Sequence, residues 1–214
     1  MYFLSKVKLT IPVSPDELRK EKEMDEMLLE KLRKDLELDT DEKLGYIVAV
    51  LDVKSSDLGK IIPGSPEIYF DAEVTLLVFK PVRSEIVEGP IVDITQGEVF
   101  VNLGCIDARC TVQNLVEGRV RYIRQMAEDG TPRPILRVPG KKIVFQIGDI
   151  LRARIQRFEY VIPVEIGPMV RGHILAAPRV VKPKSEIKIS LIAKERGLGL
   201  VSELEKERAE VLGG

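Results

Sequence analysis

The chain has 214 residues, of which 44% are hydrophobic and 31% are charged, and its formal net charge is −1. This composition allows one large domain or two small ones, and it favours no charged partner for the chain as a whole. No apolar run approaches the roughly 20 residues that cross a bilayer, and no secretory signal is visible, so we expect a soluble, cytoplasmic protein.

The first part of the chain, residues 1–82, predicts a small α+β domain. Apolar and polar residues alternate over residues 2–9, which indicates a strand. Ser14, Pro15 and Glu17 then form a helix start with a capping box, and an apolar stripe predicts that this helix runs to about Leu38. Two further strands are expected over residues 46–53 and 68–79, which gives an antiparallel sheet with one helix.

A loop is expected between these last two strands, over residues 54–64. Its end reads Gly59-Lys60-Ile61-Ile62-Pro63-Gly64, and two adjacent isoleucines between turn residues are unusual for a solvated loop. We therefore expect these isoleucines to have a partner.

The second part, residues 83–200, predicts an all-β barrel of the OB type, because short β-rich runs alternate with glycine and proline. Five strands are expected, over residues 85–94, 98–103, 109–115, 150–158 and 186–192. The interval 159–185 holds four prolines and is interpreted as an insertion, and residues 201–214 form a charged tail that is helical or frayed.

The two parts differ in charge. Residues 1–82 hold 12 basic and 17 acidic side chains, whereas residues 83–200 hold 19 basic and 13 acidic ones. An acidic module joined to a basic module indicates two different partners, although a difference of this size also arises from chance variation along a surface.

Residues suited to catalysis are scarce. His173 is the only histidine, no phosphate-binding glycine loop is present, and no spacing singles out an acid–base pair. The two cysteines, Cys105 and Cys110, are too few for a disulfide scaffold or a zinc site, so we expect buried or half-buried thiols. These absences predict no catalytic site, no metal and no other cofactor.

Basic residues of the second part are the better signal. Arg119, Arg121 and Arg124 surround Tyr122, while Arg152 and Arg154 share one face of a predicted strand. Arginines beside an aromatic ring on an OB barrel are typical of a surface that binds single-stranded nucleic acid, with an ordinary solvated surface as the alternative.

Several motifs, in this order along nearly the whole chain, resemble one family. They are Met1-Tyr2, Leu44-Gly45-Tyr46-Ile47-Val48-Ala49-Val50, the Gly59–Gly64 segment, Leu77-Val78-Phe79-Lys80-Pro81, Gly97-Glu98-Val99-Phe100-Val101-Asn102-Leu103-Gly104, Gly148-Asp149-Ile150-Leu151-Arg152-Ala153-Arg154-Ile155 and Lys188-Ile189-Ser190-Leu191. In these the chain resembles the family of the seventh subunit of archaeal DNA-directed RNA polymerase, the counterpart of the seventh subunit of eukaryotic RNA polymerase II.

The resemblance implies a non-catalytic stalk subunit of DNA-directed RNA polymerase, with catalysis in the large subunits. The first domain, of the RNP-like type, would dock on the polymerase core through Gly59, Lys60, Ile61, Ile62, Pro63 and Gly64. The chain would form a stalk heterodimer with the archaeal counterpart of the fourth subunit of the eukaryotic enzyme, which we call the stalk partner. The barrel, of the ribosomal S-one type, would bind nascent single-stranded RNA. Its expected RNA-binding residues are Phe100, Arg109, Arg121, Tyr122, Lys141, Lys142, Arg152 and Arg154.

The chain departs from this family at two places. The third barrel strand, where the family often reads Gly-Leu-Val-His-x-Ser, here reads Ala108-Arg109-Cys110-Thr111-Val112-Gln113. The second departure is the insertion at 159–185. The competing hypotheses are a free OB-type RNA-binding factor in translation or RNA decay, and, less favoured, a nuclease or transferase.

Overall fold

The computed structural model describes residues 1–18, 23–126, 130–141, 143–161 and 186–212. Two compact units are present: unit 1 comprises Met1–Lys80 and Tyr160–Glu186, and unit 2 comprises Pro81–Glu159 and Ile187–Gly214. The chain therefore passes between the units at Lys80 and Pro81, and again near the ends of the segment predicted as an insertion. Nearly all of that segment, His173 included, lies outside the described residues.

Unit 1 is built on an antiparallel sheet in the order β1-β4-β3-β2. Its strands are β1 (Tyr2–Val13), β2 (Thr40–Asp41), β3 (Gly45–Ile61) and β4 (Ile68–Phe79). Residues of β4 are alternately buried and half-buried, which confirms the strand predicted from its apolar pattern. Strand β1 pairs with β4 over twelve residues and forms one edge of the sheet.

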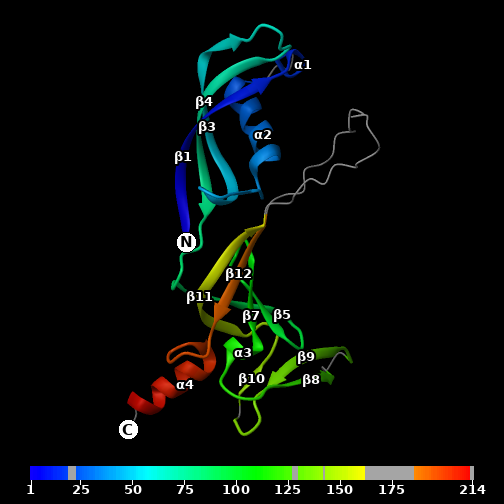
Figure 1. The fold of residues 1–214 in the computed structure, drawn as a ribbon, viewed down its shortest axis with the longest axis vertical. Coiled ribbons are helices and arrows are strands. Elements are labelled where there is room, and N and C mark those ends of the chain that lie inside the picture. Colours follow the sequence, from blue (N-terminus) through cyan, green and yellow to red (C-terminus); the bar gives the residue numbers. More distant parts are fainter. Residues whose placement is uncertain (19–22, 127–129, 142, 162–185, 213–214) are drawn as a thin grey trace, which may run out of the picture. The chain divides into compact units, whose positions relative to one another are not determined.

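One face of this sheet carries helix α2 (Met24–Leu36), as Figure 1 shows. Its buried residues Met27, Leu28 and Leu32 form the core together with sheet residues such as Val50 and Val74. The single helix predicted from Pro15 to about Leu38 is wrong. Helix α1 (Pro15–Leu18) is separate, because the backbone at Glu23 is extended, and α1 has no buried residue that would tie it to the sheet.

The predicted capping interaction is present at α1. The Ser14 backbone N–H donates to Oε2 of Glu17 at 2.9 Å, and the Ser14 hydroxyl and the Lys31 ammonium lie at 3.1 and 3.0 Å from the same oxygen. The backbone hydrogen bond from Ser14, followed by that from Lys31, lowers the pKa of Glu17 below its usual value. This carboxylate joins the start of α1 to α2.

The loop predicted over residues 54–64 is wrong for most of its length, because β3 continues to Ile61 and pairs with β4 as far as Ile61–Ile68. The strand continues despite its polar sequence because it carries register shifts, one of them between Ser55 and Gly59, where the extra residues bulge out of the ladder. Alternation of apolar residues is lost at such a bulge, so the pattern resembles a loop.

Unit 2 contains a closed barrel of five strands, as predicted for an OB fold. They are β5 (Ile86–Ile94), β6 (Glu98–Asn102), β7 (Asp107–Thr111), β11 (Ile150–Val161) and β12 (Glu186–Ile192). The order is β12-β7-β6-β5-β11, with β12 also pairing with β11, and a two-residue strand β13 (Gly199–Leu200) extends beside β11. Inward residues such as Val99, Cys110 and Leu151 are fully buried in the barrel (Figure 1).

Two features of unit 2 differ from the sequence prediction. The expected strand over residues 109–115 ends at Thr111 and is followed by a short helix, α3 (Val112–Leu115), which buries Leu115. A separate antiparallel sheet contains β8 (Arg121–Met126), β9 (Pro132–Arg137) and β10 (Val144–Phe145). The charged tail forms helix α4 (Val201–Leu212).

None of the described helices combines the length and the apolar character needed to span a bilayer.

Candidate functional site: an apolar hairpin tip and a basic barrel groove

The hairpin of β3 and β4 ends in a cluster of exposed apolar side chains. Leu58 is 82% exposed, Ile61 76% and Ile62 49%. Exposed apolar side chains that are adjacent in a structure mark a surface that a partner covers. The sequence drew attention to the two isoleucines but missed Leu58, which precedes the glycine of the predicted motif.

This tip is held in place by close packing and by one ion pair. A Cβ atom at Gly59 would lie 2.6 Å from Cγ2 of Ile68 and 2.9 Å from the ring of Phe70, so only glycine fits where the strands cross so closely. Lys60 contacts Asp71 at 2.5 Å, and the Thr10 hydroxyl donates to Asp71 at 2.8 Å. These hydrogen bonds, that of Lys60 first, lower the pKa of Asp71.

A groove of about 470 Å³ crosses the outer surface of the barrel. It lies over β6, β7, β12 and β11, and it is polar and predominantly basic. Its lining residues are Arg83, Glu98, Arg109, Thr111, Asn114, Gln156, Arg157, Ser190 and Leu191.

Two of the predicted RNA-binding residues meet beside this groove. Phe100 on β6 is the register partner of Arg109 on β7, so both side chains leave the same face of the sheet. On its other side Arg109 neighbours Ser190 of β12 through the parallel ladder. The half-buried ring of Phe100 therefore borders the arginine that projects over the groove floor.

A pair of amides forms another part of the groove. The Asn114 side-chain N–H donates to the side-chain oxygen of Gln156 at 3.1 Å, and the Asn114 backbone oxygen accepts hydrogen bonds from Ala193 at 2.7 Å and Lys194 at 3.0 Å. Helix α3, which carries Asn114, is thereby fastened to the chain that follows β12. The amide pair is thus positioned by the backbone, which leaves its remaining polar atoms toward the groove.

The charges of the groove favour an anion. Arg83, Arg109 and Arg157 face a single lining carboxylate, that of Glu98. Within the part of the chain that the structure describes, Arg83 and Arg109 form no ion pair, and Arg157 reaches Glu159 at 3.6 Å in a pair that is more than half exposed. Exposed pairs of this kind are weak. Guanidinium groups bind phosphate oxygens in bidentate fashion, and amides and hydroxyls bind polar edges, so the groove can hold a phosphate and a base together.

The structure does not bring the predicted Arg152 and Arg154 into the groove. Both project outward from β11, as their strand parity predicts, but Arg152 forms an ion pair with Glu88 at 2.5 Å and Arg154 with Glu195 at 2.9 Å. Their positive charges are therefore largely offset within the protein.

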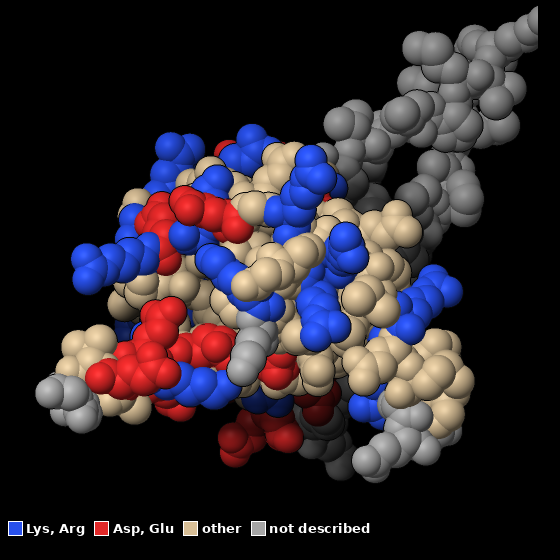
Figure 2. Space-filling model, turned by 90° about the horizontal axis from the view of Figure 1, so that it is seen from below, with Lys and Arg blue, Asp and Glu red and all other residues tan. Residues whose placement is uncertain are grey.

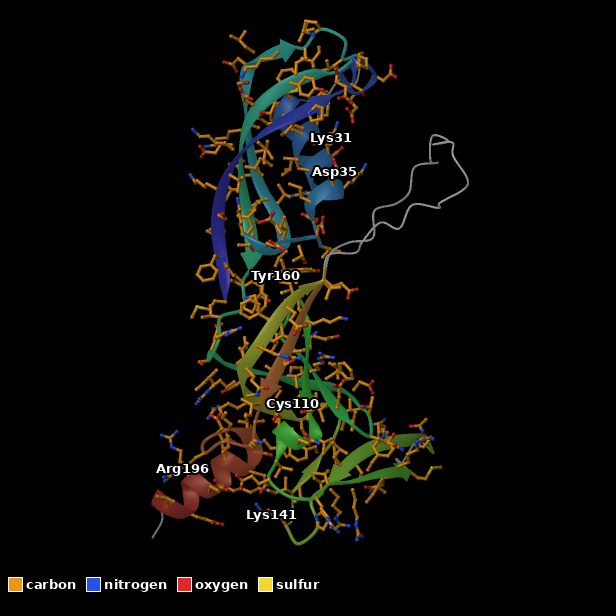
Figure 3. All side chains as sticks on the ribbon, viewed as in Figure 1. Lys31, Asp35, Cys110, Lys141, Tyr160 and Arg196 are labelled. Carbon is orange, nitrogen blue, oxygen red and sulfur yellow. The ribbon has the colours of Figure 1, made fainter. Side chains whose placement is uncertain are left out.

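The remaining predicted residues lie elsewhere in unit 2. Arg121 and Tyr122 are on opposite faces of β8, in the separate three-stranded sheet. Lys141 follows β9 and lines a second hollow of about 310 Å³ beneath α4, where Figure 3 labels it together with Arg196. Lys142 lies outside the described residues.

Sequence reasoning missed Arg83, Asn114, Gln156 and Arg157 as groove residues. Arg83 lies in the linker, and the amides are single residues without a motif. The first and last of these four residues are more than 70 positions apart along the chain, so only barrel closure shows that they are neighbours.

The two thiols lie in different environments. Cys110 is fully buried inside the barrel (Figure 3), and burial raises the pKa of its thiol to about 12. Cys105 is partly exposed, and neither forms a disulfide. The expectation of buried or half-buried thiols is confirmed.

Comparison with known proteins gives a family match and several relatives. Residues 8–66 match the family model described as the SHS2 domain found in the N terminus of Rpb7p/Rpc25p/MJ0397. The chain is 30% identical over 155 residues to DNA-directed RNA polymerase subunit Rpo7 of Saccharolobus shibatae, across 72% of this chain and 81% of that protein.

Other relatives carry related names. Subunit Rpo7 of Saccharolobus solfataricus is 29% identical over 155 residues, with the same coverage of both chains. DNA-directed RNA polymerase II subunit RPB7 of Saccharomyces cerevisiae is 31% identical over 106 residues, which span 49% of this chain and 61% of the yeast protein.

Proposed function

Because the chain belongs to the Rpo7/RPB7 family of DNA-directed RNA polymerase subunits, we propose that it is a non-catalytic stalk subunit that docks on the polymerase core, pairs with the stalk partner and contacts nascent RNA. As a subunit of this transcription enzyme it has polymerase subunits as partners. Under the proposal, nucleotide addition takes place in the large subunits.

The observation that carries the docking role is the hairpin tip. Leu58, Ile61 and Ile62 are exposed at the end of a two-stranded extension that a glycine contact and the Lys60–Asp71 ion pair hold in one conformation. A preformed apolar tip loses little conformational freedom on binding, so its burial contributes directly to affinity. The segment Gly59–Gly64 with Leu58 is therefore our docking surface.

Pairing within the stalk heterodimer is supported by the free edge of β1. This strand is an edge of the unit 1 sheet, and Leu4 on it is 70% exposed. An edge strand presents unpaired backbone N–H and C=O groups, which proteins usually cover. We propose that the stalk partner covers this edge. Amide hydrogen exchange along β1 should slow when the stalk partner binds, and unchanged exchange would exclude β1 from the interface.

Contact with RNA is supported by the barrel groove. Arg109 and Phe100 supply a cation and a stacking ring side by side, and the groove adds two more arginines and the amide pair. Bases stack on such rings at about 1–3 kcal/mol each, while arginines neutralise phosphates. Arg152 and Arg154 would contribute to RNA binding only after exchange of their carboxylate partners.

A tagged copy of the full chain, expressed in its native source, tests the proposal as a whole. The large polymerase subunits and the stalk partner should be recovered with it. Recovery of ribosomes or RNA-decay proteins in place of polymerase would instead support the free RNA-binding factor.

A further inference from the structure

The separate sheet of β8, β9 and β10 has one face on which arginines gather. Arg121 of β8 and Arg137 of β9 are register partners, and so are Gln125 and Arg133, so all four side chains project from one face. Between these two rows lie the register partners Ile123 and Ile135. The arginine side chains are exposed, whereas Leu136 and Phe145 on the other face are buried in unit 2.

The pairing of Arg121 with Arg137 is unfavourable by itself. Residues directly opposite in an antiparallel pair have Cβ atoms about 4.5–5.5 Å apart, and like charges at that separation destabilise the sheet. Neither Arg121 nor Arg137 forms an ion pair with any acidic side chain in the described parts of the chain. An anion bound between the two guanidinium groups would remove this repulsion.

The surrounding segment is strongly basic. Residues 118–148 contain seven lysines and arginines between Arg119 and Lys142, but before Gly148 only two acidic residues, Glu128 and Asp129. Figure 2 shows this contrast: acidic side chains are grouped on the left, over α4, and basic side chains occupy the centre and right of the face. The hairpin therefore lies in a positive region of unit 2.

We propose that this arginine face of β8 and β9 is a second RNA-binding surface, separate from the barrel groove, which holds the sugar–phosphate backbone of single-stranded RNA without reading its bases. The inference rests on the proposed contact with RNA and adds to it a second binding site. Arg121 and Arg137 share one phosphate, and Arg133, four residues and about 13 Å from Arg137 along the strand, reaches another.

The side chains on this face explain why the contact is to the backbone. The face carries no aromatic ring, because Tyr122 projects from the opposite face next to the buried Leu136. Bases therefore have nothing to stack on, unlike at Phe100 beside the groove. The face also lacks the large apolar core of a protein interface, since Ile123 is 37% exposed and Ile135 only 8%. Guanidinium groups with little apolar surface favour phosphates over an acidic protein.

Salt-dependent binding of the full chain to labelled single-stranded oligouridine tests the inference. The double variant Arg121→Gln, Arg137→Gln should flatten the plot of log affinity against log salt by about 0.7 per lost phosphate contact, and up to about 1.4 in total. At 0.1 M salt this corresponds to a loss of about 5- to 25-fold in affinity. The variant Lys8→Gln, Lys34→Gln removes the same charge from unit 1 and should leave the slope unchanged.

The outcomes separate this inference from the proposed function. If the wild type binds oligouridine and the hairpin variant retains its slope, the second surface is refuted while the groove remains. If the wild type binds no RNA, the proposed RNA contact itself fails. If the variant binds RNA normally but no longer recovers a polymerase subunit, the face binds an acidic protein, which also overturns the inference. The hairpin variant should melt no lower than the wild type, because it loses a like-charge pair.

Discussion

Replacing Ile61 and Ile62 with serine tests the docking surface most directly. Ile61 is 76% exposed and Ile62 49%, so docking can bury at most about one and a quarter isoleucine side chains. Full burial of such a side chain stabilises by about 1.5–3 kcal/mol. The double variant should therefore lose about 2–4 kcal/mol of docking free energy, which is about 20- to 500-fold in affinity.

The assay is titration of core polymerase lacking this subunit with the labelled full chain. The folded state should be unaffected, since both side chains are largely exposed and do not belong to the unit 1 core. The matched control is Val211→Ser on α4, whose side chain is 82% exposed and lies outside the hairpin tip. If the double variant docks within about threefold of the wild type, the reasoning from exposed apolar surface is wrong.

Three further predictions concern stability and reactivity. Gly89→Ala should lower the unfolding free energy of unit 2 by about 1–3 kcal/mol, seen as a lower melting temperature, because the new Cβ would lie 2.1 Å from the backbone oxygen of Asn102. Cys105 should react with iodoacetamide near neutral pH while Cys110, with a pKa raised to about 12, reacts only on unfolding; mass spectrometry decides. Glu17→Gln should destabilise unit 1 near neutral pH. Because the folded-state pKa of Glu17 is lowered, its contribution is present above the ordinary pKa of 4.5 and is lost as pH falls through the folded value. Urea unfolding of wild type and variant should therefore converge in acid; a difference independent of pH would contradict this.

Local patterns in the sequence were sufficient for the elements whose residues alternate regularly. Strand β4, predicted over residues 68–79, and strand β12, predicted over residues 186–192, have the predicted bounds. The interaction of Ser14 with Glu17 was also readable, because a capping box involves residues only three positions apart. The family itself was recognisable from motifs in order along the chain, and the comparisons confirm it.

Elements that depend on distant partners were not readable in this way. Strand β3 continues beyond Val53 only because β4 pairs with it across bulges, which interrupt the apolar alternation. Strands β8 and β9 contain few apolar residues, so they were noticed for their arginines and not for their structure.

The sequence by itself determined the fold class, the family and the apolar hairpin tip, since each depends on residues that are close along the chain. Only the tertiary structure decided which arginines can meet an anion. Barrel closure places Gln156 beside Asn114 and joins Arg83, Arg109 and Arg157 in one groove, whereas Arg152 and Arg154 find carboxylate partners. Charge acts through distance in space, and spacing along the chain does not report that distance.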